Sequence, residues 1–377
     1  MKKMTPILLL LFIPLFSFAS PELEENDQLI IFHTFNGDWA VADSMLDAQI
    51  AKNPDSPKYY ALKGPFYFYT RYFNQGQLPG DSLMEKCAEY SRKAIEIGEN
   101  VEMTLDNQFF VGTAHGYLSR YYGRQGQYWN AYWAARKCRS YFNDILDENP
   151  DYVDAYMGLA VIEYYTARMT GWYGFLAWLV GMSGDRDEAL TQFHIVAEKG
   201  KYCKTEALFA LIALYRFFEN DYDQARELGN KFIEKHPDNL FVAAQMQQME
   251  FLVLVQEKGV DFLRAEFDSL GTKYNITNPG ILNTLGYNYL NQNLYDEAIK
   301  ILKINIELFP DVANGYDSLS EAYLTAGNAE MAIKYSKLCL EKLPGDDTIN
   351  EEFRENLRTI SEDRLDELGA NTDAVNI

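Results

Sequence analysis

Residues and motifs that catalytic and metal sites use are scarce in this sequence, and each absence excludes a class of function. The 377 residues include only 4 histidines and 4 cysteines, and neither type occurs at a metal-ligand spacing. The chain has no HExxH or GxSxG motif, no phosphate-binding glycine loop and no EF-hand loop. Its many carboxylates show no pattern that singles out an acid/base pair. We therefore predict no catalytic residue, no cofactor and no metal site, and a protein that is not an enzyme.

The few cysteines also argue against a disulfide scaffold. Cys87, Cys138, Cys203 and Cys339 are far apart and lie in or beside segments that we interpret as helical. Two interpretations stay open. An exported protein can pair some of its cysteines, but small buried thiols fit the helical positions better.

Positive charge is scarce as well. The chain has 34 Lys and Arg residues against 55 Asp and Glu residues, so its formal net charge is −21. So acidic a chain predicts a soluble protein that binds no nucleic acid and avoids anionic membrane surfaces.

Long apolar runs are rare, and the first lies at the amino terminus. Lys2 and Lys3 precede an apolar run over residues 7–18, and Ser17-Phe18-Ala19 is a small-x-small cleavage pattern. The run is shorter than the roughly 20 residues of a spanning helix. Residues 1–19 are therefore predicted to be a cleavable signal peptide, with a retained anchor as the alternative. We expect an exported protein, periplasmic or associated with the cell envelope, with no transmembrane helix in the mature chain.

Strand-like alternation is also missing, whereas a 34-residue repeat is clear. Residues 279–312 and 313–346 align without gaps, and each unit ends near a proline. This pattern resembles the tetratricopeptide repeat (TPR) family, in which every unit is a pair of antiparallel helices. The matched pairs are Leu285 with Leu319, Tyr289 with Tyr323, Ala298 with Ala332, and Pro310 with Pro344.

Weaker copies of the repeat extend towards the amino terminus. The resemblance implies an all-α fold, a right-handed superhelical solenoid of about eight TPR-like helical hairpins with a C-terminal capping helix. Residues 20–200 are predicted to form irregular, aromatic-rich repeats and residues 201–346 more regular ones. Residues 347–369 would form the capping helix and residues 370–377 a frayed tail.

One repeat, within residues 151–200, is interrupted. Its small contact residues, Ala160 and Ala189, are 29 positions apart, whereas Gly286 and Ala298 of a regular unit are 12 apart. The excess of 17 holds the second apolar run, "TGWYGFLAWLVGM". We therefore predict an apolar insert at residues 166–184, between the two helices of one repeat.

The residues around this insert support a narrower resemblance. The pattern G-x-S-G-x-R is met by Gly181, Ser183, Gly184 and Arg186, and "FFVGTAHGYLSRY" lies upstream. Both stretches resemble one branch of TPR proteins. Its eukaryotic members are outer-mitochondrial-membrane or inclusion-body-clearance proteins, and its bacterial relatives are exported. The likeness implies an interaction role and no known reaction.

The polar end of the insert has two interpretations. Asp185 can cap the next helix, with Glu188 completing a capping box and Gly184 supplying a tight turn. Alternatively, Asp185 and Arg186 line a ligand pocket. The apolar half could pack into the concave side of the solenoid, hold a hydrophobic ligand or partner, or touch a membrane.

Aromatic and arginine side chains are abundant in the first half of the chain. Many would fill the core, but Tyr, Trp and Arg also suit recognition surfaces. We predict a non-catalytic scaffold or adaptor that binds a protein or peptide through a concave aromatic groove. The alternative is a carrier for a hydrophobic small molecule or lipid held under residues 170–182. The candidate binding residues are Tyr121, Arg124, Trp129, Trp133, Tyr164, Arg168, Trp172, Tyr173, Phe175, Trp178 and Arg186.

Overall fold

The computed structural model describes residues 23–74, 78–169, 171 and 184–370 of the chain. All the regular secondary structure in this part is helical, and no strand occurs in it, so the predicted all-α class is confirmed. The predicted signal peptide, the last seven residues and most of the apolar insert lie outside the described residues. The repeat number and the superhelical hand stay predictions.

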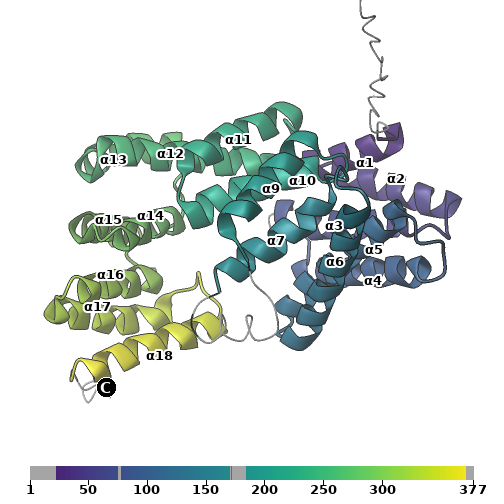
Figure 1. Cartoon of the computed structure of the whole chain (residues 1–377). Helices are drawn as coiled ribbons and strands as arrows, with labels where there is room; N and C mark the ends of the chain where they lie inside the picture. The colour runs from purple at the N-terminus through teal and green to yellow at the C-terminus, as the bar shows by residue number, and fades with distance from the viewer. Residues whose placement is uncertain (1–22, 75–77, 170, 172–183, 371–377) are drawn as a thin grey trace, which may run out of the picture.

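Consecutive helices pair as antiparallel hairpins (Figure 1). The pairs are α1 (Glu25–Asn36) with α2 (Trp39–Lys52), α3 (Pro57–Phe73) with α4 (Gly80–Gly98), α5 (Leu105–Arg124) with α6 (Tyr128–Glu148), α7 (Ala155–Ala167) with α9 (Arg186–Lys199), α10 (Lys204–Leu214) with α11 (Tyr222–Lys235), α12 (Leu240–Lys258) with α13 (Val260–Lys273), α14 (Gly280–Asn291) with α15 (Tyr295–Leu308), and α16 (Ala313–Thr325) with α17 (Ala329–Lys342). The π-helical turn η1 (Tyr215–Glu219) extends α10, the 3₁₀ turn η2 (Leu343–Gly345) follows α17, and α18 (Glu351–Glu367) comes last.

Small residues set the spacing inside these hairpins, as the repeat pattern predicts. A Cβ added to Gly286 on α14 would lie 2.6 Å from the Leu302 side chain on α15, and Ala298 has no exposed surface. Gly158 on α7 similarly faces the ring of Phe142 on α6, where a Cβ would overlap the ring. Tight packing of this kind tolerates no added methyl group without a shift of the helices.

The array of hairpins curves so that the first hairpin contacts the fifth. We call this curved part of the array the curl. Tyr202, just before α10, donates its hydroxyl to Asp27 on α1 at 3.2 Å, and Asp27 also pairs with Lys58 on α3 at 2.5 Å. Asn239, at the start of α12, donates to the backbone carbonyl of Phe35 at 2.6 Å. These contacts place residues about 200 positions apart side by side and join α1 to the α11–α12 connection.

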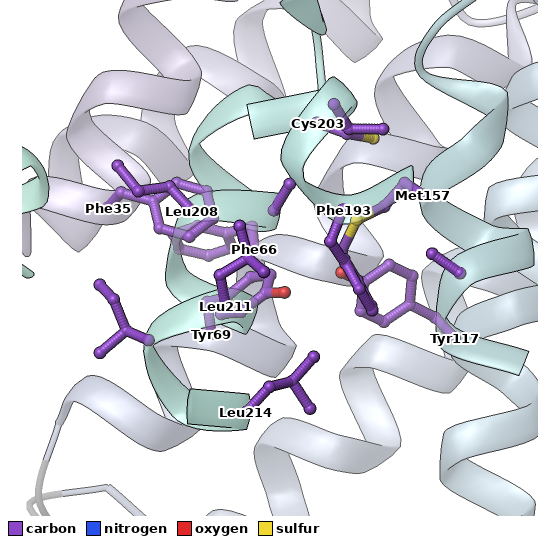
Figure 2. Packing of buried hydrophobic residues seen from close by; sticks show 14 of the residues in the cluster. Phe35, Phe66, Tyr69, Tyr117, Met157, Phe193, Cys203, Leu208, Leu211 and Leu214 are labelled. Carbon is purple, nitrogen blue, oxygen red and sulfur yellow. The ribbon is translucent and has the colours of Figure 1, made fainter. Parts of the chain in front are cut away.

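Helix α10 fills the space inside this curl. Figure 2 shows Leu208, Leu211 and Leu214 of α10 among buried side chains from α1, α3, α5, α7 and α9. Phe209 adds edge-on contacts to Tyr69 and Phe73 of α3, with ring centroids 5.7 and 5.1 Å apart. Much of the aromatic content of the first half is therefore core, where each large apolar side chain contributes roughly 1.5–3 kcal/mol by burial.

The later hairpins stack one beneath another and end at α18 (Figure 1). Arg364 of α18 donates to Asp317 of α16 at 2.7 Å, and both side chains are buried. Leu357 and Leu365 of the same helix are buried against the last hairpin. Helix α18 lies within the predicted range 347–369 and covers the end of the array.

The cysteines and the lengths of the helices can be compared next. The four cysteines are all free and buried, which confirms the thiol interpretation. The α5/α6 hairpin is long: α5 has 20 residues and α6 has 21, whereas α14 and α15 have 12 and 14. Its tip therefore extends beyond the length of a regular repeat.

Candidate functional site

The two ends of the insert meet where α7 ends and α9 begins. Gly184 lies so close to α7 that an added Cβ would overlap the carbonyl oxygen of Glu163 and lie 2.7 Å from the amide nitrogen of Ala167. The φ of Gly184 is not left-handed. Glycine is thus required for close backbone approach rather than for the predicted tight turn, because only a residue without Cβ fits there.

Asp185 caps α9, as one of its two interpretations predicts. Its carboxylate accepts the backbone N–H groups of Asp187 at 2.9 Å and Glu188 at 3.0 Å. The capping box is only half formed. Among the described contacts, the Glu188 carboxylate accepts from the side chain of Gln192 at 3.2 Å and not from the N–H of Asp185.

Beside this cap, one carboxylate gathers side chains from both ends of the insert. Glu219, at the end of η1, accepts hydrogen bonds from Nε of Arg186 at 3.0 and 2.9 Å and a further one from its Nη2. The Tyr164 hydroxyl also donates to Glu219, and Nη1 of Arg168 lies 3.8 Å away. We call Tyr164, Arg168, Arg186 and Glu219 the Glu219 cluster. It ties α7, α9 and η1 together at the base of the insert.

The electrostatics of the cluster follow from burial and these donors. The Glu219 side chain is 8% exposed. Burial alone would raise the pKa of its carboxyl, but the hydrogen bonds from Arg186 and Tyr164 and the charge of Arg168 outweigh it and lower the pKa. Burial, followed by the bond to this carboxylate, raises the pKa of Tyr164. Glu219 is thus held as an anion, which keeps both arginines in place.

The backbone that carries Glu219 is irregular. Residues Tyr215–Glu219 form a π-helical turn, which Asn220 ends at a left-handed φ of 55°. Arg216 in this turn is buried and donates to the side chains of Gln245 and Gln248 on α12. Single π turns occur often at functional positions because they redirect side chains. Here the turn brings Glu219 to the ends of the insert.

An exposed aromatic surface lies next to the cluster. Tyr165 on α7 is 48% exposed and packs edge-on against Phe218 of η1 at 6.0 Å, and Arg168 lies 5.0 Å from the Phe218 ring centroid. Arg120 and Tyr72 both act electrostatically on the Tyr165 hydroxyl. Tyr72 on α3 is itself 43% exposed. We call Tyr72, Tyr165, Arg168 and Phe218 the aromatic rim.

Four other predicted site residues lie on the α5/α6 hairpin. Trp129 and Trp133 are exposed, at 65% and 44%, and Arg124 is paired with Asp81 at 3.3 Å. Tyr121, in contrast, is buried and donates to Glu85 on α4 at 2.6 Å, so its ring offers no binding surface. No contact within the described part of the chain joins these four residues to Glu219.

The remaining predicted residues are those of the insert itself. Trp172, Tyr173, Phe175 and Trp178 lie outside the described residues, so their binding role stays a prediction.

Sequence reasoning missed the residue that organises this site. Glu219 is 33 positions from Arg186 and 55 from Tyr164, so no local spacing relates the three. Tyr72, Tyr165 and Phe218 were likewise left out of the predicted set, because aromatic residues in a helix have no sequence signal that separates rim from core. The stretch "YRFFEN" before a helix start offered the nearest hint.

The interior of the curl is mostly filled by side chains, so it leaves little space for the concave groove that the sequence predicts. Tyr117 donates to Glu206 at 2.7 Å, and Arg120 lies 3.6 Å from the same carboxylate. Two adjoining cavities border Glu206, of ≈ 30 and ≈ 50 Å³. Such volumes admit a few water molecules. The cavities around Glu206 are therefore too small for a peptide or a drug-sized ligand.

Comparisons with known proteins yield structural likeness alone. No protein-family model matches the chain, and no curated protein matches it. Among solved structures, it is similar to a tetratricopeptide repeat protein from Parabacteroides merdae, with 14% identity, 89% of this chain and 98% of that chain covered, and a TM-score of 0.30. The Cut9–Hcn1 assembly of the APC/C gives 14% identity, 85% and 59% coverage, and a TM-score of 0.33. The TPR domain of P58(IPK) gives 14% identity, 91% and 98% coverage, and a TM-score of 0.22. We draw nothing about function from similarities this low.

The described residues also lack a membrane-spanning helix and a metal-binding cluster. No helix there is both long and apolar enough to cross a bilayer. No group of three or more His, Cys, Asp or Glu side chains there is placed to hold a metal ion. The described chain is thus an all-α solenoid of TPR-like helical hairpins, in which one hairpin carries an insert whose ends meet at Glu219.

Proposed function

We propose that this protein is a non-catalytic scaffold that binds a partner protein at the aromatic rim, next to the insert. The observation that carries the proposal is the rim itself. Exposed Tyr165 packs against Phe218 with Arg168 over the same ring, and the Glu219 cluster ties the helix that carries Tyr165 and Arg168 to α9 and η1. Tyrosine and arginine give a large contact area with a polar tip, and they are enriched at the energetic centres of interfaces.

One side chain of the rim is already positioned by contacts within the chain. Arg168 is placed over Phe218 and beside Glu219, so it loses little conformational freedom when a partner binds. Preorganised side chains of this kind raise affinity by lowering the entropy cost of association. The predicted export signal supports a periplasmic or envelope location, and the lack of catalytic motifs supports a non-catalytic role.

A quantitative pulldown from envelope extract tests this function. The double variant Tyr165→Ala/Arg168→Ala removes two rim side chains, and Phe353→Ala/Arg358→Ala on α18 is the matched control, with an exposed aromatic and a partly exposed arginine. We expect a partner that the wild type and the control retain and that the rim variant loses. Circular dichroism must show that all three proteins are folded.

Two outcomes would decide against the proposal. One is a set of partners that is the same for the rim variant and the wild type. The other is a co-purified lipid in native mass spectrometry that is lost on deletion of residues 170–182. The second result would favour the carrier function.

A further inference from the structure

We infer that the tip of the α5/α6 hairpin docks on an anionic lipid surface. The docking surface, which we call the α6 patch, consists of Tyr128, Trp129, Tyr132, Trp133, Arg136 and Lys137. It is separate from the aromatic rim, and the inference does not rest on the proposed partner-binding function.

The aromatic part of the patch is unusually exposed. Tyr128, Trp129 and Trp133 are 75%, 65% and 44% exposed. Trp129 stacks on Tyr132 at 5.6 Å and meets Trp133 edge-on at 5.7 Å, so the rings form one continuous surface. Scattered single apolar residues on a surface need no explanation, but a contiguous group of large rings marks a contact site. Tyr and Trp are the side chains that favour the boundary between lipid and water.

The charge on this hairpin is opposite to that of the whole protein. Residues 107–143 contain no Asp or Glu, although the chain has 55 such residues and a net charge of −21. The same stretch holds five cations, which are Arg120, Arg124, Arg136, Lys137 and Arg139. The expectation that the protein avoids anionic membranes was based on the net charge of the whole chain. That net charge hides a local basic surface on this hairpin.

The neighbouring elements leave two of these cations free to act. Asp81 on α4 pairs with Arg124, and Arg139 acts electrostatically on Glu163 of α7. Arg136 lies over the Trp133 ring at 5.3 Å and donates to the Tyr132 hydroxyl at 3.3 Å, and it has no carboxylate partner among the residues that the structure describes. Lys137 is exposed and has no ion pair in the described part of the chain. Positive charge thus adjoins the aromatic rings.

The order of residues along α6 fits a membrane better than an acidic peptide. The rings come first, at the tip, and Arg136 follows Trp129 by seven residues, or about 10 Å along a helix. The polar zone of a bilayer is roughly 5–8 Å deep on each side. Rings that enter this zone would bring the cations level with lipid phosphates. The acidic residues Asp144, Asp147 and Glu148 lie at the opposite end of α6, away from the surface.

Co-sedimentation with vesicles tests the inference. The processed protein is mixed with phosphatidylcholine vesicles, either pure or with about 30 mol% phosphatidylglycerol to supply negative charge. We expect binding to the anionic vesicles and weak binding to the neutral ones, with a clear loss between about 50 and 300 mM salt. Arg136→Gln/Lys137→Gln should weaken binding by roughly 30-fold, at about fivefold per cation. Trp129→Ala/Trp133→Ala should abolish it.

The matched controls lie on the other half of the molecule. Arg264→Gln/Lys300→Gln removes two exposed cations from α13 and α15, and Phe353→Ala removes an exposed ring from α18. Both should bind as the wild type does. Absence of vesicle binding, equal binding to neutral and anionic vesicles, or equal binding by the patch variants would each overturn the inference. Patch variants that lose a protein partner while vesicle binding is unchanged would instead assign the surface to a peptide.

Discussion

Asn36 and Asp238 lie 202 positions apart in the sequence and hold each other by two hydrogen bonds. Nδ2 of Asn36 donates to the Asp238 carboxylate at 3.0 Å, and the backbone N–H of Asp238 donates back to Asn36 Oδ1 at 3.2 Å. Asn36 is 3% exposed, whereas Asp238 lies at the surface. This pair closes the curl of the first hairpins and defines where α1 sits.

Because of this contact, the stability of the first hairpin depends on its attachment to the segment that follows the fifth. Asn36→Ala should cost about 1–3 kcal/mol of unfolding free energy, because two hydrogen bonds across the closure are lost and one of them is to a charged carboxylate. Hydrogen exchange should quicken mainly in α1 and α2. Asn143→Ala, at an exposed position on α6, is the control and should change little. Equal effects of both substitutions, or faster exchange spread evenly over the chain, would show that the pair does not hold the curl.

Gly184 and Gly123 should respond to alanine with opposite signs. At Gly184 a Cβ overlaps the Glu163 carbonyl, so Gly184→Ala should destabilise the protein by about 1–3 kcal/mol. At Gly123, within α5, nothing lies within 4 Å of an added Cβ. Gly123→Ala should stabilise by about 0.4–1 kcal/mol, through a less flexible unfolded chain. Chemical denaturation measures both, and a neutral Gly184→Ala would contradict the close approach of α7 and α9.

Glu219 should give the protein an acid-sensitive contribution to stability. Its pKa in the folded protein lies below the ordinary value of 4.5, so the unfolded chain takes up its proton first as the pH falls. The stability that Glu219 provides is complete above about pH 5 and is lost as the pH drops through the folded pKa. Glu219→Gln should lower stability at pH 7 and flatten its pH dependence below 5.

The measurement is a series of denaturation curves between neutral and acid pH. Glu234→Gln on α11 is the control, because Glu234 is exposed and forms no hydrogen bond or ion pair within the described part of the chain. A Glu219→Gln profile parallel to that of the wild type at all pH values would contradict the assignment. The variant should also weaken any partner binding at the rim, since Arg168 and Arg186 lose their anchor.

His236 should make a second pH-dependent contribution to the free energy of unfolding, in a higher pH range than that of Glu219. It is buried among Phe32, Phe35 and Phe232, and burial, with the charge of Lys235 nearby, lowers its pKa from 6.5 to about 4. An unfolded histidine takes up a proton near pH 6.5 while the folded one does not. Stability should therefore fall as the pH drops from 6.5 towards 4.

His236→Phe should reduce the slope of stability against pH, because the substitution removes the titrating group. It keeps an aromatic ring among the three phenylalanines, so the packing is preserved. The remaining slope belongs in part to His115, whose pKa burial also lowers to about 4. Urea melts at several pH values in this window measure the change. An unchanged slope in the variant would show that the His236 ring is protonated in the folded protein.

Local patterns predicted much of the architecture because each concerns residues within one or two turns of a helix. The 34-residue repeat correctly predicted the pairing of α14 with α15 and of α16 with α17. The contact of Gly286 with Leu302 and the cap at Asp185 follow from the same short-range rules. Gly184 was correctly noticed, but its reason is a contact with another helix, which the turn pattern could not reveal.

The sequence by itself determined the helical class, the hairpin repeat and the position of the interruption, since these depend on periodicity and on small or capping residues at fixed spacings. Only the tertiary structure decided how the interrupted hairpin is held. Glu219 reaches Arg186 and Tyr164 through a π turn, and Asn36 reaches Asp238 through the curl of the whole array. The Glu219 contacts depend on how α7 and α9 pack against the next hairpin, whereas the Asn36–Asp238 pair depends on the rotation accumulated over successive hairpins, which small packing differences in each intervening repeat set.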